Sequence, residues 1–403
     1  MITVVGGVYG EYCMHPAWRE TYGSAGRAAS ALAAMGVPTT LHSYADDKSL
    51  DILNSRILLE DFAVVSTSIP RSIGFEYAHG LSTPSIFGIP KLQHAPIQVH
   101  AEKIVRFGML EGEAIVDAKY AVYDPQNLGV PAPFAQNGSK AEHLALILNL
   151  HESRQMSGLK EASAEDAAKA LSQQQDAEVV VIKMGPCGAM VWSNGMAAQI
   201  PAYRTNRVWK IGSGDCFVAH FARAWMHEGL TPAVAAQAAS KATAYYCSTQ
   251  GFPTRDLLNQ FSVPEVELSD RYLGGYLPNV YLAGPFFSLT QRWMIEQART
   301  NLREVGLTVF SPFHDVGHGS ADDVVEKDIQ GIKDADIVFA VGDGMDAGTL
   351  YEIGYARAIN KPVVMYCENE SDEDKKMMSG SGCVICSDYT TAIYATLWEA
   401  AKL

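Results

Sequence analysis

Two short segments place an acidic side chain at the start of an expected helix, where it could take part in catalysis. In residues 211–219, two glycines and a serine precede an Ala-rich helix, and Asp215 lies in its first turn. Free N–H groups and the helix dipole favour negative charge there, so Gly212, Ser213 and Gly214 could hold a phosphoryl group. Asp215 could then accept a proton from a substrate hydroxyl. The alternative is an ordinary glycine-rich helix start.

The second segment, residues 346–356, follows the apolar run 337–341 and opens a helix. Its Thr349-x-x-Glu352 spacing is typical of a capping box, in which the glutamate bonds only to the N-cap N–H group. A carboxylate at the N-terminal turn of a helix, above the carboxyl edge of a parallel sheet, is also where open α/β folds bind ligands. Spacing alone leaves both interpretations open.

Strand-like apolar runs alternate with Ala-rich stretches, which predicts α/β domains with largely parallel sheets. We expect strands at residues 2–5, 39–43, 121–123, 178–182 and 189–192, and helices at 27–35, 141–148 and 215–227. Residues 263–278 combine Pro, Gly and charge without periodicity, which predicts a linker between domains of residues 1–262 and 279–403. The acidic stretch 368–376 is expected to be a solvated loop.

The composition narrows the function classes. The chain has 31 Lys and Arg against 45 Asp and Glu, a net charge of −14, which argues against nucleic acid and anionic membrane surfaces as partners. Without a signal peptide pattern or a long apolar run, and with seven scattered cysteines, we expect a cytoplasmic protein with no membrane span.

Residues 1–262 resemble the ribokinase-type (PfkB) family of sugar and nucleoside kinases. Residues 211–219 are similar to its Gly-Ala-Gly-Asp signature before a helix, and residues 23–41 look like its first signature. Residues 180–188 resemble the strand and glycine turn that lead to the nucleotide site. Asn149-x-x-Glu152 is similar to an Asn-x-x-Glu element of that family, which helps to organise magnesium and phosphate.

The resemblance implies a ribokinase-like three-layer domain that uses ATP and Mg²⁺ to phosphorylate a nucleoside or sugar hydroxyl. Asp215 would be the base, Mg²⁺ would lie near Asn149 and Glu152, and further ATP contacts would come from the nucleotide-site turn, at Lys183 and Gly185. On the acceptor side, Arg27 stands where the family usually has a sugar-binding Asn, and Glu11 where Asp is common. These two changes imply an atypical acceptor, or a domain that binds without phosphorylating.

Residues 279–366 resemble the nucleoside 2-deoxyribosyltransferase family and its N-glycosidase relatives. The resemblance is carried by the opening strand 280–285 with its Tyr281, by the Asp328-x-x-Gly-Ile segment, and by the stretch from Asp346 to Glu352. It implies a smaller flavodoxin- or Rossmann-like parallel-sheet domain that needs no cofactor.

In this second resemblance Glu352 is the nucleophile, which attacks the anomeric carbon and forms a glycosyl-enzyme ester, as in retaining glycosidases. Tyr281 would orient that carboxylate, and Asp328 or Asp346 would assist departure of the base. Water would then give hydrolysis, and a second base would give transfer. Further substrate contacts are expected at Gly284, Gly348, Thr349 and His318, and, as a backbone nest for a 5′-phosphate, at Ser379 and Ser381.

Together these features predict a bifunctional enzyme of nucleoside or nucleotide metabolism, which cleaves or transfers an N-glycosidic bond and phosphorylates a nucleoside or sugar. We expect small-molecule nucleosides, nucleotides or sugars as partners, and a homo-oligomer. The alternative is a nucleotide-sensing or scaffold protein with a degenerate kinase half. Intact Asp215 and Glu352 favour the enzyme, whereas Arg27 favours a repurposed kinase half.

Overall fold

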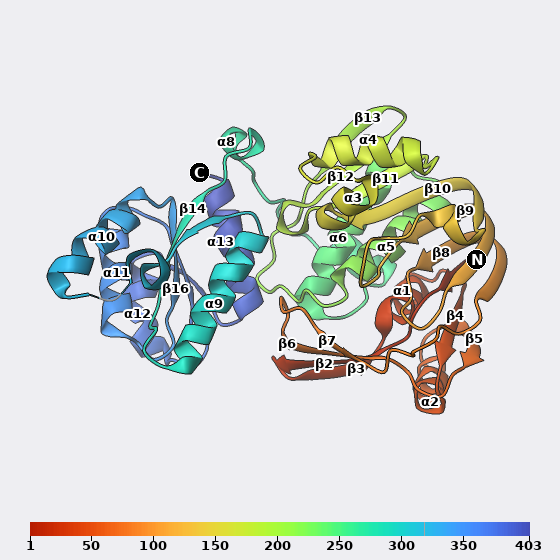
Figure 1. The fold of residues 1–403 in the computed structure, drawn as a ribbon, viewed down its shortest axis with the longest axis horizontal. Helices are drawn as coiled ribbons and strands as arrows, with labels where there is room; N and C mark the ends of the chain where they lie inside the picture. The colour runs from red at the N-terminus through yellow and green to blue at the C-terminus, as the bar shows by residue number, and fades with distance from the viewer. Residues whose placement is uncertain (318) are drawn as a thin grey trace. The chain divides into compact units, whose positions relative to one another are not determined.

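The computed structural model describes residues 1–317 and 319–403, so His318, an expected substrate contact, lies outside the described residues. The chain divides into two compact units, one containing residues 1–205 and 209–265 and the other residues 206–208 and 266–403. Each unit has its own sheet and helices (Figure 1). We refer to them as the N-terminal and the C-terminal domain.

The N-terminal domain is built on a nine-stranded sheet with the order β13-β12-β11-β10-β9-β8-β1-β4-β5. Neighbouring strands from β11 to β5 in this order run parallel, and the edge strands β12 and β13 are antiparallel. The strands are β1 (Ile2–Val5), β4 (Thr39–Ala45), β5 (Phe62–Ser68), β8 (Ile97–Phe107), β9 (Ala114–Asp124), β10 (Lys140–Asn149), β11 (Val179–Lys183), β12 (Ala189–Ser193) and β13 (Met196–Ile200).

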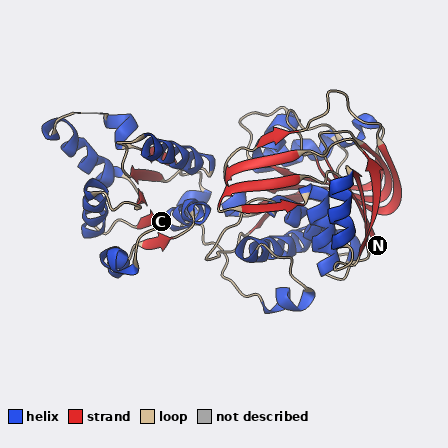
Figure 2. Cartoon of the chain, turned by 90° about the horizontal axis from the view of Figure 1, so that it is seen from below, coloured by secondary structure: helices blue, strands red, loops and turns tan. Residues whose placement is uncertain are grey.

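Side chains of this sheet alternate between two apolar cores. Val4 and Val181 belong to one core, which also contains residues of three helices, and their chain neighbours Val5 and Val180 belong to the other. Successive side chains of a strand point to opposite faces, so both faces of the sheet are covered, as expected for a three-layer domain (Figure 2). The first core is covered by α1 (Gly23–Ala34), α5 (Ser213–Ala222) and α6 (Pro232–Thr249), and the second by α3 (Leu150–Ser157) and α4 (Ala164–Gln174).

A separate four-stranded sheet, β3-β2-β6-β7, belongs to the same domain. Along β2 the side chains of Glu11 and Cys13 are buried, whereas those of Tyr12 and Met14 are exposed. The alternation shows that the inner face of this sheet carries a charged residue, Glu11, into the protein. The strands are β2 (Gly10–His15), β3 (Trp18–Thr21), β6 (Gly74–His79) and β7 (Ser85–Phe87).

The C-terminal domain has a five-stranded, all-parallel sheet with the order β15-β14-β16-β17-β18. Counted along the chain this is the order 2-1-3-4-5, which confirms the expected flavodoxin-like arrangement. The strand order reverses between β14 and β16, and open α/β sheets bind ligands in the crevice at such a point. The strands are β14 (Asn279–Ala283), β15 (Thr308–Phe310), β16 (Ile337–Val341), β17 (Val363–Tyr366) and β18 (Val384–Cys386).

The other helices complete both domains. The C-terminal domain contains α8 (Asp270–Leu273), α9 (Leu289–Glu304), α10 (Ala321–Asp334), α11 (Ala347–Ala358), α12 (Asp372–Gly380) and α13 (Tyr389–Ala401). The N-terminal domain also contains α2 (Asp47–Arg56) and α7 (Arg255–Gln260), and a π-helical turn at Arg223–His227 continues α5. Within the described residues, each helix is too short or too polar to cross a membrane.

Two local expectations are wrong. Residues 141–148 form strand β10 rather than a helix, because Leu146 and Ile147 pack into opposite cores, and a short apolar run of this kind fits a strand buried on both faces. The acidic stretch 368–376 is not all loop, since Ser371 caps α12 by accepting a hydrogen bond from the Asp374 N–H group. The two units divide after residue 265, within the expected linker 263–278, and this segment also contains α8, where Ser269 bonds to the carbonyl of Ala401.

We expect Gly23→Ala to destabilise the N-terminal domain strongly. Gly23 has φ +60°, and a Cβ atom there would lie 2.4 Å from the Gly7 carbonyl oxygen and 2.7 Å from the Tyr9 nitrogen. Gly36→Ala is the matched control, because its φ is +72° but nothing lies within 4 Å. The control should lower the free energy of unfolding by about 1 kcal/mol because of its backbone conformation. Gly23→Ala should lower it by at least ~2 kcal/mol more, because the backbone of Gly7 and Tyr9 must move to make room for the Cβ atom. Equal losses in urea denaturation would contradict this account.

Candidate functional site

In the C-terminal domain, strand β14 and helix α11 bring together two of the expected catalytic residues. The hydroxyl of Tyr281, on β14, donates a hydrogen bond of 2.6 Å to Oε1 of Glu352, on α11. The N-cap of α11 is Asp346, which accepts hydrogen bonds from both the N–H group (2.9 Å) and the hydroxyl (3.0 Å) of Thr349. Glu352 therefore lies beyond the first helical turn and bonds to Tyr281, so the capping-box alternative is wrong.

The environment of Glu352 favours its neutral form. Burial raises its pKa to about 7; the hydrogen bond from Tyr281 lowers the value, and the negative charges of Asp328 and Asp346 raise it further. Burial also raises the pKa of Asp328, and the Oδ1 atom of Asp328 is buried with no hydrogen-bond partner among the described residues. The site thus contains a carboxyl group with a pKa raised to about 7, that of Glu352, and a second one, that of Asp328, with a buried oxygen that has no hydrogen-bond partner among the described residues.

The expected substrate contacts near this pair have structural roles. A Cβ atom on Gly284 would lie 2.7 Å from Cδ1 of Ile295 and 3.1 Å from Cβ of Val341, so this glycine permits close packing at the end of β14. Thr349 is buried and its hydroxyl is bonded to Asp346. A Cβ atom on Gly348 would lie 3.2 Å from the carboxylate of Asp346. These residues shape the start of α11.

The expected phosphate nest at residues 379–382 is wrong. This segment is the C-terminal end of α12, where Ser379 is helical and Ser381 is the C-cap. The N–H groups of Ser381 and Gly382 bond to carbonyls of the preceding turn, and the Ser381 hydroxyl donates to Met378. A helix C-terminus presents the negative end of the dipole, which disfavours an anion. In the sequence, the Ser371-x-x-Asp374 spacing indicated a helix that begins at this point and could have shown that residues 379–382 form its C-terminal end.

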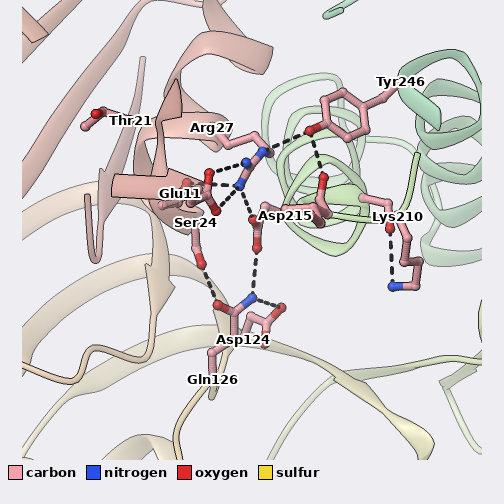
Figure 3. A network of polar contacts seen from close by, with 12 residues as sticks. Glu11, Thr21, Ser24, Arg27, Asp124, Gln126, Lys210, Asp215 and Tyr246 are labelled. Carbon is pink, nitrogen blue, oxygen red and sulfur yellow. Dashed lines mark hydrogen bonds and ion pairs between the residues drawn. The ribbon is translucent and has the colours of Figure 1, made fainter. Parts of the chain in front are cut away.

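In the N-terminal domain, Asp215 lies in the first turn of α5, as expected, but both of its carboxylate oxygens are occupied (Figure 3). Oδ2 accepts a hydrogen bond of 2.9 Å from Nη1 of Arg27, and Oδ1 accepts one of 2.8 Å from Nε2 of Gln126. The side chain of Asp215 is itself buried. The carboxylate is held between a cation and an amide.

Arg27 is completely buried and pairs with two acids (Figure 3). Its Nη2 lies 2.6 Å from Oε2 of Glu11 and its Nε donates to the Tyr246 hydroxyl at 3.1 Å. Burial by itself lowers the pKa of Arg27, but the charge of Glu11, with those of Tyr246 and Asp215, raises it well above the ordinary value. Arg27 thus stays charged.

Basic groups gather at the N-terminal end of α5. The ammonium of Lys183 lies 2.8 Å from Oδ2 of Asp124 and 3.4 Å from the Cβ position of Gly214. Burial raises the pKa of Asp124 to about 7, although Lys183 lowers it. Lys210 donates to the Ser213 hydroxyl at 3.4 Å, and burial lowers its pKa. Two lysines and the free N–H groups of α5 can attract a phosphate group.

Four residues of this site were missed from the sequence: Asp124, Gln126, Lys210 and Tyr246. Lys210 stands two positions before Gly212, so its place beside the helix start was readable. Asp124 is the last residue of the buried strand β9 and Gln126 follows it by two positions, which was a weaker signal. Gly185, expected at the nucleotide site, begins a 3₁₀ turn after β11 with φ +57°.

The residues expected near Mg²⁺ form a capping box at the start of α3. Asn149 Oδ1 accepts from the Glu152 N–H group at 2.8 Å, and Glu152 Oε2 accepts from the Asn149 N–H group at 2.7 Å. Within residues 1–317 and 319–403, His, Cys, Asp and Glu side chains form no group of three or more that could hold a metal. One oxygen of each side chain is therefore engaged in the start of α3.

Comparison with known proteins identifies a family in each domain. Residues 131–254 match the model of the pfkB family of carbohydrate kinases, and residues 280–384 match that of nucleoside 2-deoxyribosyltransferase. A search of the curated proteins finds no match.

Several solved structures are similar to this chain. A putative ribokinase from Agrobacterium tumefaciens is 16% identical, covering 64% of this chain and 96% of that chain with a TM-score of 0.49. A nucleoside kinase from Methanocaldococcus jannaschii, an archaeal member of the ribokinase family, is 15% identical, with coverages of 64% and 96% and a TM-score of 0.48. A fructokinase from Vibrio cholerae O395, bound to fructose, ADP and calcium, is 14% identical, with coverages of 64% and 98% and a TM-score of 0.49.

Both family models match within the domains in which the sequence motifs indicated these families. The chain thus joins a segment that matches the pfkB carbohydrate kinase model to a segment that matches the nucleoside 2-deoxyribosyltransferase model.

Proposed function

We propose that residues 279–403 cleave or transfer the N-glycosidic bond of a nucleoside through a covalent bond between Glu352 and the sugar. The observation that carries this proposal is the 2.6 Å hydrogen bond from Tyr281 to Glu352. It fixes a buried carboxylate on the helix that follows β16, and β14 and β16 flank the point where the strand order reverses. A fixed carboxylate with one oxygen bonded and one available is suited to attack an anomeric carbon.

The reaction would proceed in two displacements. Glu352 forms a bond to the anomeric carbon while the C–N bond breaks, and the electron pair of that bond leaves with the base. Oε1 accepts the Tyr281 hydrogen bond, so Oε2 is the attacking atom. Water or a second base then displaces Glu352 and regenerates the carboxylate.

Asp328 is better suited than Asp346 to give a proton to the leaving base. Burial raises its pKa, so a larger fraction is protonated at neutral pH, and its Oδ1 atom has no partner among the described residues. Asp346 instead accepts two hydrogen bonds as the N-cap of α11. Asp346 would act on the reaction mainly through its charge, which raises the pKa of Glu352.

The charges around the site favour an unphosphorylated substrate. The charges that act on Glu352 are those of Asp328 and Asp346, both negative. A phosphate dianion close to these groups would be repelled, and the segment 379–382 presents a helix C-terminus in place of the expected anion site. We therefore propose free nucleosides as substrates of this domain.

For residues 1–262 we propose binding of a nucleotide such as ATP at the N-terminal end of α5, next to Lys183 and Lys210. When bound, ATP with hydrated Mg²⁺ would supply the phosphoryl group for a kinase reaction. The kinase reaction itself was one of two expectations, and the ion pair between Arg27 and Asp215 favours the other, binding without phosphorylation. In this proposal the protein cleaves or transfers nucleoside bonds and senses a nucleotide.

Glu352→Gln should lower base release by a factor of about 10³ or more, because Gln is a poor nucleophile of the same size. The measurement is release of free base from a panel of nucleosides, with and without a second base as acceptor. Glu373→Gln, at an exposed side chain on α12, is the matched control and should leave the rate unchanged. A folded Glu352→Gln protein with normal turnover would remove the basis of the proposal.

Base release should increase with pH through about 7, because Glu352 attacks only when ionised and its pKa is raised to about 7. Asp346→Asn should move this rise to lower pH, since it removes a negative charge that raises the pKa of Glu352. Asn is also a good N-cap, so α11 should persist. A rise near pH 4.3, the ordinary value for Glu, would contradict the burial argument.

Nucleosides should react with a kcat/KM at least about tenfold above that of their 5′-monophosphates, a difference of about 1.4 kcal/mol that two nearby carboxylates can supply. Replacing both Ser379 and Ser381 by Ala should change neither value, because the N–H groups of Ser381 and Gly382 bond within the helix end. A preference for the monophosphate, lost in the double variant, would show that the substrate carries a phosphate.

A further inference from the structure

The N-terminal domain carries a fixed positive charge at the carboxylate expected to act as its base. A general base must offer a lone pair within hydrogen-bond reach of the proton that it takes. Asp215 accepts from Arg27 with one oxygen and from Gln126 with the other, and both contacts lie within 3 Å (Figure 3). The acceptor hydroxyl of a kinase substrate would have to share an oxygen of Asp215 with one of these donors, and the charge of Arg27 weakens the pull of that oxygen on a proton.

Gln126 is not free to turn away from Asp215. Its Oε1 accepts a hydrogen bond from the Ser24 hydroxyl, on α1, and its Nε2 also lies 3.3 Å from Oδ2 of Asp124. Ser24 holds the oxygen of the Gln126 amide, and its NH₂ group is thereby directed at Asp124 and Asp215. The hydrogen bond from Gln126 to Oδ1 of Asp215 therefore belongs to a network of side chains.

Arg27 is held still more firmly. Both oxygens of Glu11 accept from it, at 2.6 and 3.3 Å, and it is also bonded to Tyr246, whose hydroxyl donates to the Ile211 carbonyl at 2.9 Å. A Cβ atom on Gly212 would lie 2.0 Å from Nε of Arg27, so the guanidinium packs directly against the glycine turn before α5. Its side chain is 1% exposed, so water does not compete for these contacts.

The other side of the α5 turn remains available to an anion. The Lys183 side chain is 16% exposed, and Lys210 bonds to a neutral hydroxyl, that of Ser213. Arg27 is shared by the carboxylates of Glu11 and Asp215, and the ammonium of Lys183 is paired with Asp124, so Lys210 and the N–H groups at the start of α5 are the groups left to attract a phosphate. Binding of a phosphate group and proton abstraction by Asp215 are therefore separable.

We propose that Arg27 is a built-in substitute for the phosphoryl acceptor, which makes the N-terminal domain a nucleotide-binding domain that does not phosphorylate. The inference rests on the proposed nucleotide binding at α5 and adds the reason why no phosphoryl group is transferred. Its guanidinium fills the acceptor side and neutralises the base from within. The domain can then report the nucleotide level without consuming the nucleotide.

The first test restores the residue types of the family on the acceptor side. Wild-type protein should bind Mg-ATP in calorimetry but form no ADP with a panel of sugars and nucleosides beyond the level of Asp215→Asn. The double variant Arg27→Asn, Glu11→Asp should form ADP with some acceptor, at least about 10² above the same variant carrying Asp215→Asn, because a freed base contributes that much. The proposal is overturned if the wild type forms ADP and the Asp215→Asn variant does not. It is also overturned if the double variant folds and binds ATP but forms no ADP.

The second test is a stability measurement that needs no activity. Asp215→Asn should lower Tm by about 4 °C or more, because it removes one partner of a buried ion pair. Asp51→Asn, at an exposed position of α2, is the control and should not change Tm. An unpaired buried carboxylate destabilises a protein, so its removal would leave Tm unchanged or raise it. Such a result for Asp215→Asn would mean that Arg27 does not pair effectively with Asp215 in the wild type, and it would overturn the proposal.

Nucleotide binding at α5 and the pairing of Arg27 with Asp215 can be disproved separately. Nucleotide binding at α5 is wrong if calorimetry finds no binding of Mg-ATP, or if Lys183→Met binds Mg-ATP as well as the wild type. The Tm of Asp215→Asn then still decides whether Arg27 neutralises the base.

Discussion

A charge that is buried away from water must be paired with an opposite charge or shift its protonation, and this constraint decides what each domain can do. In the N-terminal domain, the carboxylate of Asp215 is paired with Arg27 and also accepts a hydrogen bond from Gln126. In the C-terminal domain, Glu352 has no cation beside it, and burial, with the charges of Asp328 and Asp346, raises its pKa to about 7 although the Tyr281 hydrogen bond lowers it. The first solution fixes the carboxylate in place, and the second leaves it able to gain and lose a proton.

Both carboxylates are presented by the same local device, the N-terminal half of a helix. Asp215 lies in the first turn of α5, whereas Glu352 lies beyond the first turn of α11. Such helix starts gather N–H groups and a positive dipole end, which favours anionic ligands and negative side chains alike. The device therefore positions an acid but does not determine its use. That use follows from the partners of the two carboxylate oxygens.

The sequence predicted the parts of the fold that depend on local pattern. The alternation of apolar strands and Ala-rich helices predicted two α/β domains, and the Gly-rich turn and the Glu352 segment predicted helix starts that the structure contains. Residues 141–148 were misassigned because a run buried on both faces has no period of two, and this was decided only by pairing with β9 and β11. Residues 379–382 were misassigned because a Gly/Ser run does not reveal which end of a helix it forms.

The partners that set the chemistry lie far apart in the chain. Arg27 is separated from Asp215 by 188 positions and from Tyr246 by 219 positions. No local spacing could predict these contacts, although an arginine at a position expected to bind sugar already indicated a change of role. A motif identifies an acid at a helix start, whereas its reactivity depends on whether tertiary packing supplies a cation. In this chain packing supplies a cation to Asp215 and acidic neighbours to Glu352, which is why we propose binding alone for the first domain and catalysis for the second.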